Sequence, residues 1–422
     1  MSFAPLGLHS DLLVVLESLN YQRPTPIQLE AIPEVLAGHD VLAGAQTGTG
    51  KTAAFALPLI HRHLANLEQN SDQNSERNIR VLVLTPTREL AQQVQQSFVK
   101  YSQGLGFNSV VAYGGASINP QIEALNQGCD VLVATPGRLL ELAIKELIDL
   151  STIETLVLDE ADRMLDMGFI NDINRILKRL PESRQTLFFS ATFNDEVFAL
   201  SKTILNTPKL IEVAERNATA AKVEHRFYEV DAKRKAAMLA YLIGSKNWQQ
   251  VLIFTRTKQA VDELVTELAK DGIKAAAVHG DKSQGARDRG LEEFKSGKVR
   301  ALVATDVAAR GLDIKELQYV VNFELPYNAE DYIHRIGRTG RAGQAGVAVS
   351  LIAHKEKYLF EEVKELTGEE LLMQWFPGFE PDFMAQEEED RGKRKPSKKS
   401  LRAKALGEHK GSKARTNKRR RR

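Results

Sequence analysis

Short apolar runs recur along the first half of the chain, and each is bounded by polar residues or turn formers. These runs are Val81–Thr85, Val110–Ala112, Val131–Ala134, Leu156–Leu158 and Thr186–Phe189. They are almost continuously apolar and do not alternate, which is typical of strands buried on both faces of a parallel sheet. Stretches of good helix formers, such as Arg88–Gln96, lie between them. The first half therefore predicts a parallel sheet covered by helices.

The same pattern restarts in the second half. After the run Val251–Phe254, apolar residues recur at the spacings of three and four that mark one face of a helix. They are Ala260, Val261, Leu264, Val265 and Leu268, and the further strand-like runs are Val299–Ala304, Val320–Phe323 and Val347–Ile352. We therefore predict an α/β protein with two domains, each a mainly parallel sheet wound by helices on both faces.

The expected boundaries follow from changes in composition. The segment 213–222 is polar and Ala-rich, which favours a linker, with a short surface helix as the alternative. We expect an N-terminal domain at 1–212, a C-terminal domain at 223–368 and an extension at 369–390. The extension contains Leu371–Met373 and Trp375–Phe379, so it either docks on the second domain or is exposed and binds a partner.

The last segment, 391–422, has a different composition from the rest. It holds 16 Lys or Arg and one acidic residue, Glu408, and almost no large apolar side chains. Such a segment cannot offset its conformational entropy by burial, so it should be disordered in isolation. Because the whole chain carries +2, residues 1–390 carry about −13 against +15 for this tail. The chain is therefore an acidic body with a basic tail.

Composition excludes several other classes of protein. At 422 residues the chain is long enough for two domains, and 43% of its residues are hydrophobic. No run approaches the roughly 18 apolar residues of a membrane span, and Met1–Gly7 does not resemble a secretory signal. The one cysteine, Cys129, can form no internal disulfide, and no Cys/His cluster suggests zinc. We expect a cytoplasmic protein in a reducing compartment.

A Gly-rich loop follows the predicted strand Asp40–Leu42 and precedes the helix-compatible stretch Thr52–Leu57. It consists of Ala45, Gln46, Thr47, Gly48, Thr49, Gly50, Lys51 and Thr52. In a strand–loop–helix context the backbone N–H groups of such a loop cradle a polyphosphate, and the lysine contacts the β- and γ-phosphates. Ala45 stands where the usual rule has Gly, but the later glycines are the ones that approach phosphate. The alternative is a turn with an incidental lysine.

Adjacent carboxylates follow the run Leu156–Leu158, in the segment Asp159–Asp162. One of them, Asp159, can hold Mg²⁺ together with the Thr52 hydroxyl. The next, Glu160, can then orient and deprotonate the attacking water. The two loops together predict hydrolysis of a magnesium-bound polyphosphate.

Further motifs extend this interpretation. They are Phe3 with Arg23–Gln28, then Pro86–Ala91, Gly114–Gly115, Thr135–Arg138, Ser190–Thr192, Leu252–Arg256, Gln284–Arg287, Thr305–Asp306, Ala309–Ile314 and His334–Arg341. In this order and spacing they resemble the DEAD-box family of superfamily 2 RNA helicases, over roughly residues 3–355. The resemblance implies two RecA-like domains. The segment Pro377–Asp382 is similar to one in RhlE-type bacterial members.

The resemblance also assigns roles around the nucleotide. It implies that Gln28 reads the adenine edge through its side-chain amide, although a capping glutamine in a turn is the alternative. Asn20 departs from the glycine usual at its position, which questions the local turn. The remaining contacts implied with ATP are Phe3 and Tyr21 at the base, Arg23, Gly311, Asp313 at the ribose, Arg338 and Arg341 on the γ-phosphate once the domains close, and His334 as a link to the interface between them.

The RNA contacts implied by the resemblance are to the sugar-phosphate backbone, which positions a strand without reading its sequence. They are Thr87, Arg88, Gly115, Thr135 and Arg138 in the first domain, and Arg256, Arg287 and Thr305 in the second. Ser190 and Thr192 would connect the nucleotide site, through Asp162, to domain closure.

The expected function is therefore an RNA-dependent ATPase, with ATP and Mg²⁺ as cofactors. It would unwind short duplexes locally or remodel RNA–protein complexes, in ribosome biogenesis or RNA turnover, with ribosomal precursors or RNA-decay proteins as partners. We expect a monomer with no membrane contact. An ATP-gated RNA clamp and a DNA helicase are the alternatives. The tail should raise the local concentration of RNA, although a solubilising terminus, or a nuclear-import signal in a eukaryotic source, would have the same composition.

Overall fold

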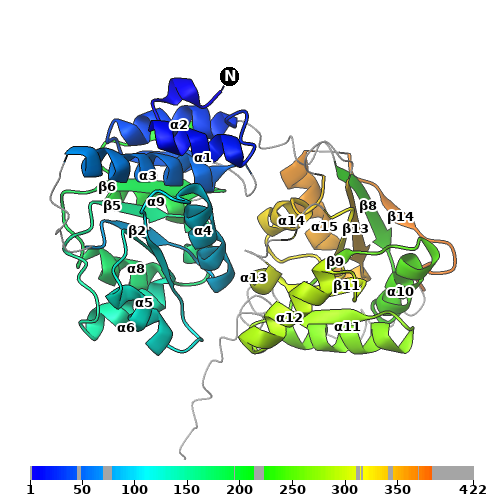
Figure 1. The fold of residues 1–422 in the computed structure, drawn as a ribbon. Helices are drawn as coiled ribbons and strands as arrows, with labels where there is room; N and C mark the ends of the chain where they lie inside the picture. The colour runs from blue at the N-terminus through cyan, green and yellow to red at the C-terminus, as the bar shows by residue number, and fades with distance from the viewer. Residues whose placement is uncertain are drawn as a thin grey trace, which may run out of the picture. The chain divides into compact units, whose positions relative to one another are not determined.

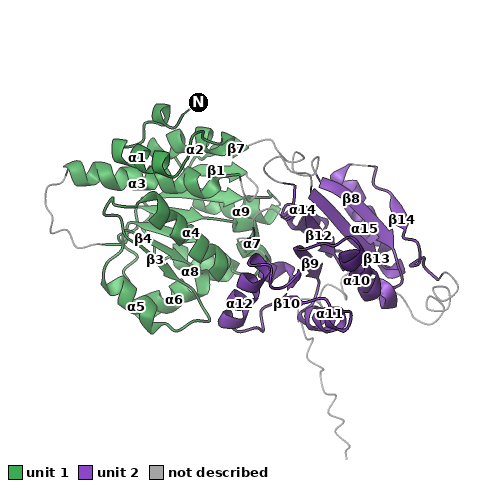
Figure 2. Ribbon diagram, turned by 45° about the vertical axis from the view of Figure 1, so that its right-hand side comes forward, with its two compact units in different colours: residues 1–216, 310–313 green, residues 217–309, 314–422 purple. Residues whose placement is uncertain are grey.

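The computed structural model describes residues 2–44, 49–69, 78–193, 195–212, 223–309, 314, 317–340, 346–368 and 370–382. The chain divides into two compact units (Figure 2). Unit 1 comprises 1–216 with 310–313, and unit 2 comprises 217–309 with 314–422. The predicted linker 213–222 and the tail 391–422 lie outside the described residues.

Unit 1 is built on a seven-stranded sheet in which all strand pairs are parallel (Figure 1). The strands are β1 (Val41–Gly44), β2 (Val81–Leu84), β3 (Ser109–Ala112), β4 (Val131–Ala134), β5 (Thr155–Leu158), β6 (Gln185–Ser190) and β7 (Lys209–Glu212), in the order β3-β4-β2-β5-β6-β1-β7. The helices are α1 (Ser10–Ser18), α2 (Pro26–Leu36), α3 (Lys51–Gln69), α4 (Arg88–Tyr101), α5 (Asn119–Asn126), α6 (Pro136–Ile144), α7 (Ala161–Asp166), α8 (Ile170–Leu177) and α9 (Asp195–Ile204).

Successive residues of these strands point to two different cores. In β2, Val81 and Val83 pack with the helices α1–α4, whereas Leu82 and Leu84 pack with α6–α9. Because side chains alternate across a strand, a sheet with helices on both faces needs apolar residues at every position. This explains the continuous apolar runs of the sequence.

Unit 2 repeats this architecture with a second seven-stranded parallel sheet. Its strands are β8 (Val223–Glu229), β9 (Val251–Thr255), β10 (Ala275–Val278), β11 (Ala301–Thr305), β12 (Tyr319–Asn322), β13 (Gly346–Ile352) and β14 (Met373–Trp375), in the order β10-β11-β9-β12-β13-β8-β14. The helices are α10 (Lys235–Ser245), α11 (Lys258–Lys270), α12 (Gln284–Lys295), α13 (Asp306–Ala309), α14 (Ala329–Ile336) and α15 (Lys357–Thr367). The predicted fold class is confirmed.

The C-terminal extension docks on unit 2, which selects one of the two alternatives left open by the sequence. Strand β14 pairs with β8, and Phe376 and Phe379 pack against Tyr241 of α10 with ring centroids 5.8 Å away in each case. The guanidinium of Arg234 lies over the Phe379 ring and donates to the carbonyl of Glu380 at 3.1 Å. The described part of the extension, 370–382, is therefore an integral edge of this unit.

No helix among the described residues is both long and apolar enough to cross a membrane.

Candidate active site and nucleic-acid interface

The site in unit 1 is built around two buried charges at the carboxyl edge of the sheet. Lys51 is the first residue of α3, and Asp159 follows β5. Lys51 Nζ lies 4.0 Å from Asp159 Oδ1, and both side chains are more than 90% buried. Neither atom has a hydrogen-bond partner within the described part of the chain. Burial raises the pKa of Asp159 to about 6, against the opposing attraction of Lys51 and with the repulsion of Glu160 adding to the rise.

These residues fit a magnesium-bound polyphosphate. Buried polar atoms are normally hydrogen-bonded, so a lysine ammonium and a carboxylate oxygen without partners indicate groups that a ligand completes. Magnesium is usually held by one or two carboxylates together with substrate phosphates, and Asp159 supplies such a carboxylate. Thr52, the half-buried residue that follows Lys51 in α3, supplies a hydroxyl. The loop residues Ala45, Gln46, Thr47 and Gly48 lie outside the described residues, and Thr49 and Gly50 lead directly into α3.

Glu160 has a strained backbone and an oriented side chain. Its φ of +54° lies in the left-handed region, and it caps the N-terminus of α7. A non-glycine residue in this conformation costs of order 1–3 kcal/mol and is often found at active sites. Its carboxylate pairs with Arg163 Nη1 at 2.5 Å, and both side chains are buried. Arg163 was missed in the sequence analysis, although its i,i+3 spacing from Glu160 on a short helix was the available signal.

Asp162 connects the carboxylate segment to the loop after β6. Its Oδ2 accepts hydrogen bonds from the backbone N–H groups of Ala191 and Thr192 at 3.2 and 3.1 Å, and from Thr192 Oγ1 at 3.1 Å. Ser190 is fully buried and donates to the Thr192 carbonyl at 2.7 Å. The structure thus brings together the three residues that were predicted to couple the nucleotide site to movement.

Phe193, which follows this loop, was not predicted. Its ring lies against Gly44 at the end of β1, where a Cβ would be 2.5 Å from the Phe193 Cε2 atom. That separation is well inside van der Waals contact, so a larger residue at position 44 would force the Phe193 ring to move. The packing ties the loop after β6 to the strand that leads into the phosphate loop.

Gln28 is held by the protein itself. Its Oε1 accepts from Thr25 N at 2.9 Å, and its Nε2 donates to the Gly50 carbonyl at 3.1 Å. The first of these bonds belongs to the capping box that starts α2. The capping role, given as the alternative, is therefore present. The second bond links Gln28 to the end of the phosphate loop, so an adenine contact would add to these bonds or replace them.

The aromatic residues predicted near the base form a cluster. The Phe3 and Tyr21 ring centroids are 6.4 Å apart, and the Tyr21 hydroxyl lies 3.0 Å from that of Tyr101. Arg23 is exposed. The turn questioned by the sequence is intact, because Asn20 has a φ of +60°, and asparagine is the residue that best replaces glycine in the left-handed region.

The first-domain residues predicted to contact RNA lie in loops after β2, β3 and β4. Thr87 caps α4 by accepting from Leu90 N at 3.3 Å. Arg88 Nη1 donates to the Gly115 carbonyl at 3.3 Å, and Thr135 Oγ1 accepts from Gly114 N at 3.4 Å.

Arg138 differs from these residues in being buried. It donates through Nη2 to the Ala116 carbonyl at 2.9 Å and pairs with Glu141 at 3.0 Å. The geometry therefore makes it a support of the 113–117 loop, and a phosphate contact would require its head group to turn outward.

In unit 2, a buried arginine that was not predicted organises the region of the candidate arginine fingers. Arg335 of α14 is 2% exposed and forms a two-pronged ion pair with Asp306 at 2.6 and 2.7 Å. Its Nη1 also donates to Asn322 Oδ1 at 3.0 Å and to the Glu324 carbonyl at 2.6 Å. These bonds fasten α14 to the ends of β11 and β12, just before the largely buried Arg338.

The other predicted residues of unit 2 lie at the same edge of its sheet. His334 Nδ1 is 3.8 Å from Asp331, and Thr305 and Arg287 are buried. Arg256 makes ion pairs with Glu324 at 3.0 Å and Glu356 at 2.6 Å, so its guanidinium is already neutralised in this structure. Gly311, Asp313 and Arg341 lie outside the described residues.

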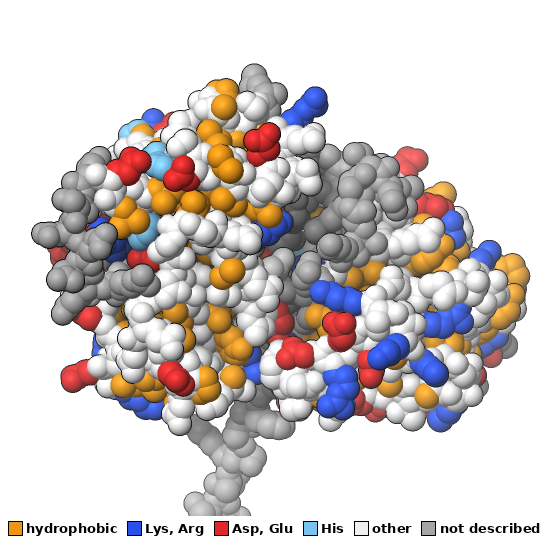
Figure 3. Space-filling view, viewed as in Figure 1, with side chains coloured by type: hydrophobic (Ala, Val, Ile, Leu, Met, Phe, Trp, Pro, Cys, Tyr) orange, Lys and Arg blue, Asp and Glu red, His pale blue; other side chains and the backbone are white. Residues whose placement is uncertain are grey.

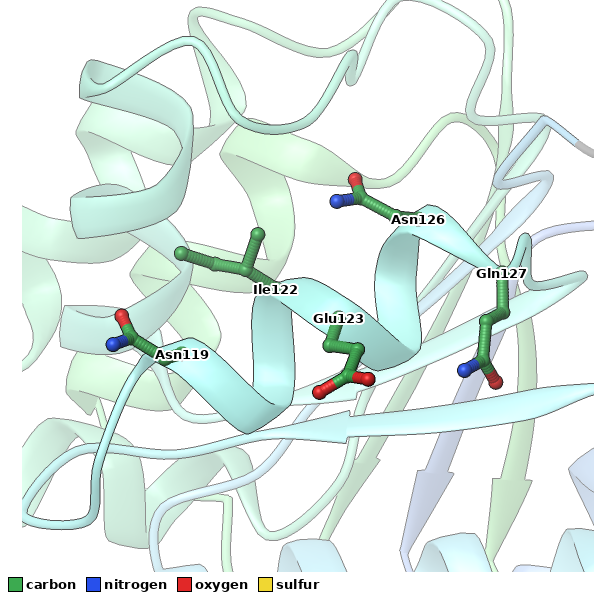
Figure 4. Close-up of a pocket in the computed structure, with 5 residues that line it drawn as sticks. All are labelled: Asn119, Ile122, Glu123, Asn126 and Gln127. Carbon is green, nitrogen blue, oxygen red and sulfur yellow. The ribbon is translucent and has the colours of Figure 1, made fainter.

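A second hollow on the surface of unit 1 is a weaker candidate for a binding site than the one around Lys51 and Asp159. It is lined by Asn119, Ile122, Glu123, Asn126 and Gln127, which all belong to α5 or to its C-terminal cap (Figure 4). Binding sites need polar groups that converge from several elements, and one helix face does not supply them.

Comparison with known proteins agrees with these observations. The model of the DEAD/DEAH box helicase family matches residues 25–200, and that of the helicase conserved C-terminal domain matches 234–343. RNA helicase CrhR from Synechocystis sp. is 44% identical over 364 residues, 86% of this chain and 72% of the relative. ATP-dependent RNA helicase CshA from Listeria monocytogenes is 40% identical over 91% of this chain and 72% of the relative.

A solved structure gives the same result. Dbp5 from S. cerevisiae, bound to RNA and ADP BeF3, has a TM-score of 0.78 and 31% identity, over 92% of this chain and 98% of that one. Two family models match in sequence order, and the two relatives are 44% and 40% identical over 72% of their length, which shows the family. The chain belongs to the DEAD-box family of ATP-dependent RNA helicases.

Proposed function

We propose that this RNA helicase hydrolyses magnesium-bound ATP at the carboxyl edge of the unit 1 sheet, with Lys51 on the phosphates and Glu160 as the base. The observation that carries the proposal is the buried pair Lys51 Nζ and Asp159 Oδ1, which lie 4.0 Å apart without hydrogen-bond partners among the described residues. Asp159 and Thr52 would hold Mg²⁺. When bound, the ion neutralises charge on the β- and γ-phosphates.

Glu160 is suited to orient the attacking water. Its carboxylate direction is fixed by Arg163, and the left-handed backbone turns it out of the helix that it caps. A base must be held within hydrogen-bond reach of the proton that it removes, and this arrangement removes rotational freedom that would otherwise be lost during the reaction.

Unit 2 would contribute Arg338 and Arg341 to the γ-phosphate, as in the family resemblance. Support within this chain comes from Arg335, whose four hydrogen bonds fix α14 and the start of the segment that follows it. Positive charge supplied there in the transition state is worth about 10³–10⁵ in rate.

RNA would bind through its backbone to the loops that carry Arg88, Gly115 and Thr135. These loops offer hydrogen-bonding groups and a cation, which suits a partner recognised by its phosphates and sugars. We infer local unwinding of short duplexes with little base specificity. Asp162 would transmit the change between bound ATP and its hydrolysis products to the loop 190–192. Its carboxylate accepts three hydrogen bonds from that loop.

The decisive experiment replaces Glu160 with Gln and measures ATP affinity, RNA affinity and steady-state ATPase activity. We expect both affinities to be retained and kcat to fall by about 10²–10⁴, the usual worth of a general base. Glu182→Gln, an exposed carboxylate of the same unit, is the matched control and should behave as the wild type. Normal turnover in the Glu160 variant would overturn the assignment of the base.

The wild-type assay also separates the rival functions. ATPase activity is measured without nucleic acid, with single-stranded RNA and with DNA of the same sequence. Stimulation by RNA alone supports the helicase, since the 2′-hydroxyl distinguishes the two polymers. Equal stimulation by DNA would favour a DNA helicase, and tight ATP-dependent RNA binding without turnover would favour a clamp.

The wider role is an inference from the sequence alone. We propose a role in ribosome assembly or RNA turnover, with ribosomal precursors or RNA-decay proteins as partners. A helicase that binds the sugar-phosphate backbone of RNA can act on many different RNAs. The similarity to RhlE-type members, the monomeric state and the cytoplasmic location also stay predictions.

A further inference from the structure

A basic hollow lies at the amino edge of the unit 2 sheet, at the opposite ends of the strands that carry its helicase motifs. Its lining residues are Asn247, Gln249, Gly272, Lys274, Gly297, Lys298 and Arg300. They come from three consecutive turns, which connect α10 to β9, α11 to β10 and α12 to β11. These strands are neighbours in the sheet, so the turns lie side by side.

The three turns share one backbone geometry. Asn247, Gly272 and Gly297 are each left-handed, with φ values of +49°, +75° and +75°. This conformation ends a helix and directs the chain into the next strand. Because strands are about 5 Å apart, the turns present their side chains along a row of roughly 10 Å.

The charge of this edge is opposite to that of the body. Segments 245–250, 270–274 and 295–300 together hold six Lys or Arg and one acid, Asp271, a net charge of +5. Residues 1–390 as a whole carry about −13. The helix-to-strand turns of unit 1 (37–40, 102–108, 127–130, 145–154 and 178–184) carry a net −2, so the fold itself does not require a basic edge here.

Helix dipoles account for only part of this charge. Lys246, Lys270 and Lys295 lie at the C-terminal ends of their helices, where a cation is stabilising. In contrast, Lys274, Lys298 and Arg300, the cations that line the hollow, come after the helices and just before the strands. The helix dipoles therefore do not account for these three cations.

Among the described residues, the cations of the hollow also lack the carboxylate partners that neighbouring lysines have. On the surface of α11 and the loop after β10, Lys258 pairs with Asp281 at 2.5 Å and Lys282 with Asp262 at 2.9 Å. Figure 3 shows Lys and Arg beside Asp and Glu over this part of unit 2. Within the described residues, the exposed Lys274 and Lys298 have no carboxylate partner, and no lining residue is acidic.

Arg300 is held in place within the hollow. Its Nε donates to the Trp248 carbonyl at 3.1 Å and its Nη2 to Asn247 Oδ1 at 2.7 Å. Both acceptors are neutral, so the guanidinium keeps its full positive charge while its position is fixed. A row of one fixed and two exposed cations, interspersed with side-chain amides, suits a chain of phosphates.

We propose that this hollow is a second contact for the phosphodiester backbone of single-stranded RNA. The inference rests on the proposed RNA-binding function and extends it. The two edges of the sheet are separated by the length of a strand, about 15 Å for five residues, and RNA must pass around the unit to reach both. The second contact should therefore matter only for RNA longer than the motif site holds.

The test is RNA affinity as a function of length and salt, for the full chain and for Lys274→Gln/Lys298→Gln. A 10-nucleotide RNA fits within one site of about 4–16 nucleotides, and a 40-nucleotide RNA can reach both. Each lost phosphate contact lowers the slope of log K against log salt by about 0.7, so we expect a fall of about 1.4 with the long RNA. At 50 mM salt its affinity should fall roughly tenfold, while the short RNA and the ATPase activity it stimulates are unchanged.

The control is Lys233→Gln/Lys364→Gln, which removes two exposed lysines of the same unit outside the hollow. It should leave the long RNA unaffected. Wild-type affinity and slope for the long RNA in the hollow variant would overturn the proposal, as would an equal loss in the control or with the short RNA. Failure of the wild type to bind even the short RNA would instead overturn the RNA-binding function on which the proposal rests.

Discussion

Replacing Asp159 by Asn should make the nucleotide-free protein more stable while abolishing its activity. The carboxylate is 2% exposed, and burial raises its pKa from 3.8 to about 6 in spite of Lys51, which lies 4.0 Å away. The folded protein therefore holds a charge that the unfolded chain accommodates more easily in water. Asparagine keeps the shape of the side chain and removes the charge.

The size of the effect follows from the pKa shift. One pKa unit corresponds to 1.36 kcal/mol, so a rise of about two units makes the ionised carboxylate cost about 3 kcal/mol of folding free energy at neutral pH. The sign follows from the raised pKa. The contribution of the Asp159 carboxyl group to the free energy of unfolding is complete below pH 3.8 and is lost as the pH rises through about 6. The advantage of the variant should therefore be full above pH 7 and shrink toward pH 4.

The assay is thermal unfolding in EDTA at pH 7.5 and pH 5, followed by far-UV circular dichroism. Both tryptophans, Trp248 and Trp375, lie in unit 2, so their fluorescence would not report on unit 1. For a unit of this size 1 kcal/mol moves Tm by about 2–4 °C, so the variant should melt roughly 6–12 °C higher at pH 7.5.

The control removes a second carboxylate from the same segment. Asp162→Asn takes away the charge of a side chain that accepts four hydrogen bonds, so it should lower Tm. If Asp159→Asn fails to raise Tm at pH 7.5, or raises it equally at pH 5, the buried charge is not the cause and the reasoning is wrong.

Three further predictions concern positioning residues. Gly44→Ala should destabilise unit 1 by about 1–3 kcal/mol because its methyl group meets the Phe193 ring, and adding Phe193→Leu should restore part of the loss, measured by circular dichroism. Arg335→Lys cannot make the two-pronged pair with Asp306 and should lower the unfolding free energy of unit 2 by about 2–4 kcal/mol, read by tryptophan fluorescence; an unchanged midpoint would contradict it. Thr192→Val removes one hydrogen bond of about 1 kcal/mol and should reduce RNA stimulation of ATPase roughly fivefold, with ATP affinity in equilibrium binding retained.

The sequence predicted the central strands of both sheets because those strands are buried on both faces. Each predicted apolar run begins and ends within two residues of the beginning and end of a strand in the structure. The strands that escaped prediction, β7, β8, β10 and β14, lie at an edge of their sheet or next to one. In β7 only Ile211 is buried, and β14 has no fully buried residue, so neither carries the apolar signal. Their place is set by pairing with β1 and β8, which are distant in the sequence.

The motifs located the site but not the bonds within it. Spacing indicated that Asp159 and Lys51 serve one ligand, and their separation agrees with this. The same spacing could not show that the amide of Gln28 is already used by Thr25 and Gly50, because those bonds depend on how α2 meets the phosphate loop. A motif specifies residue types, and the hydrogen bonds arise only when the elements pack.

Hydrogen-bond satisfaction separates the two kinds of buried cation in this protein. Arg335 and Lys51 are both cations buried at the carboxyl edge of a sheet, and both belong to motifs. Arg335 has bonds to a carboxylate, an amide and a carbonyl, so a ligand could bind it only by breaking them, and its role is to hold α14. Lys51 has one carboxylate at 4.0 Å and no hydrogen bond among the described residues, so a phosphate can bind it without that loss.

Arg256 resembles Arg335 in this respect, since Glu324 and Glu356 already neutralise it. An RNA phosphate would have to compete with both carboxylates, so we expect Arg256 to contribute less to RNA affinity than Arg88.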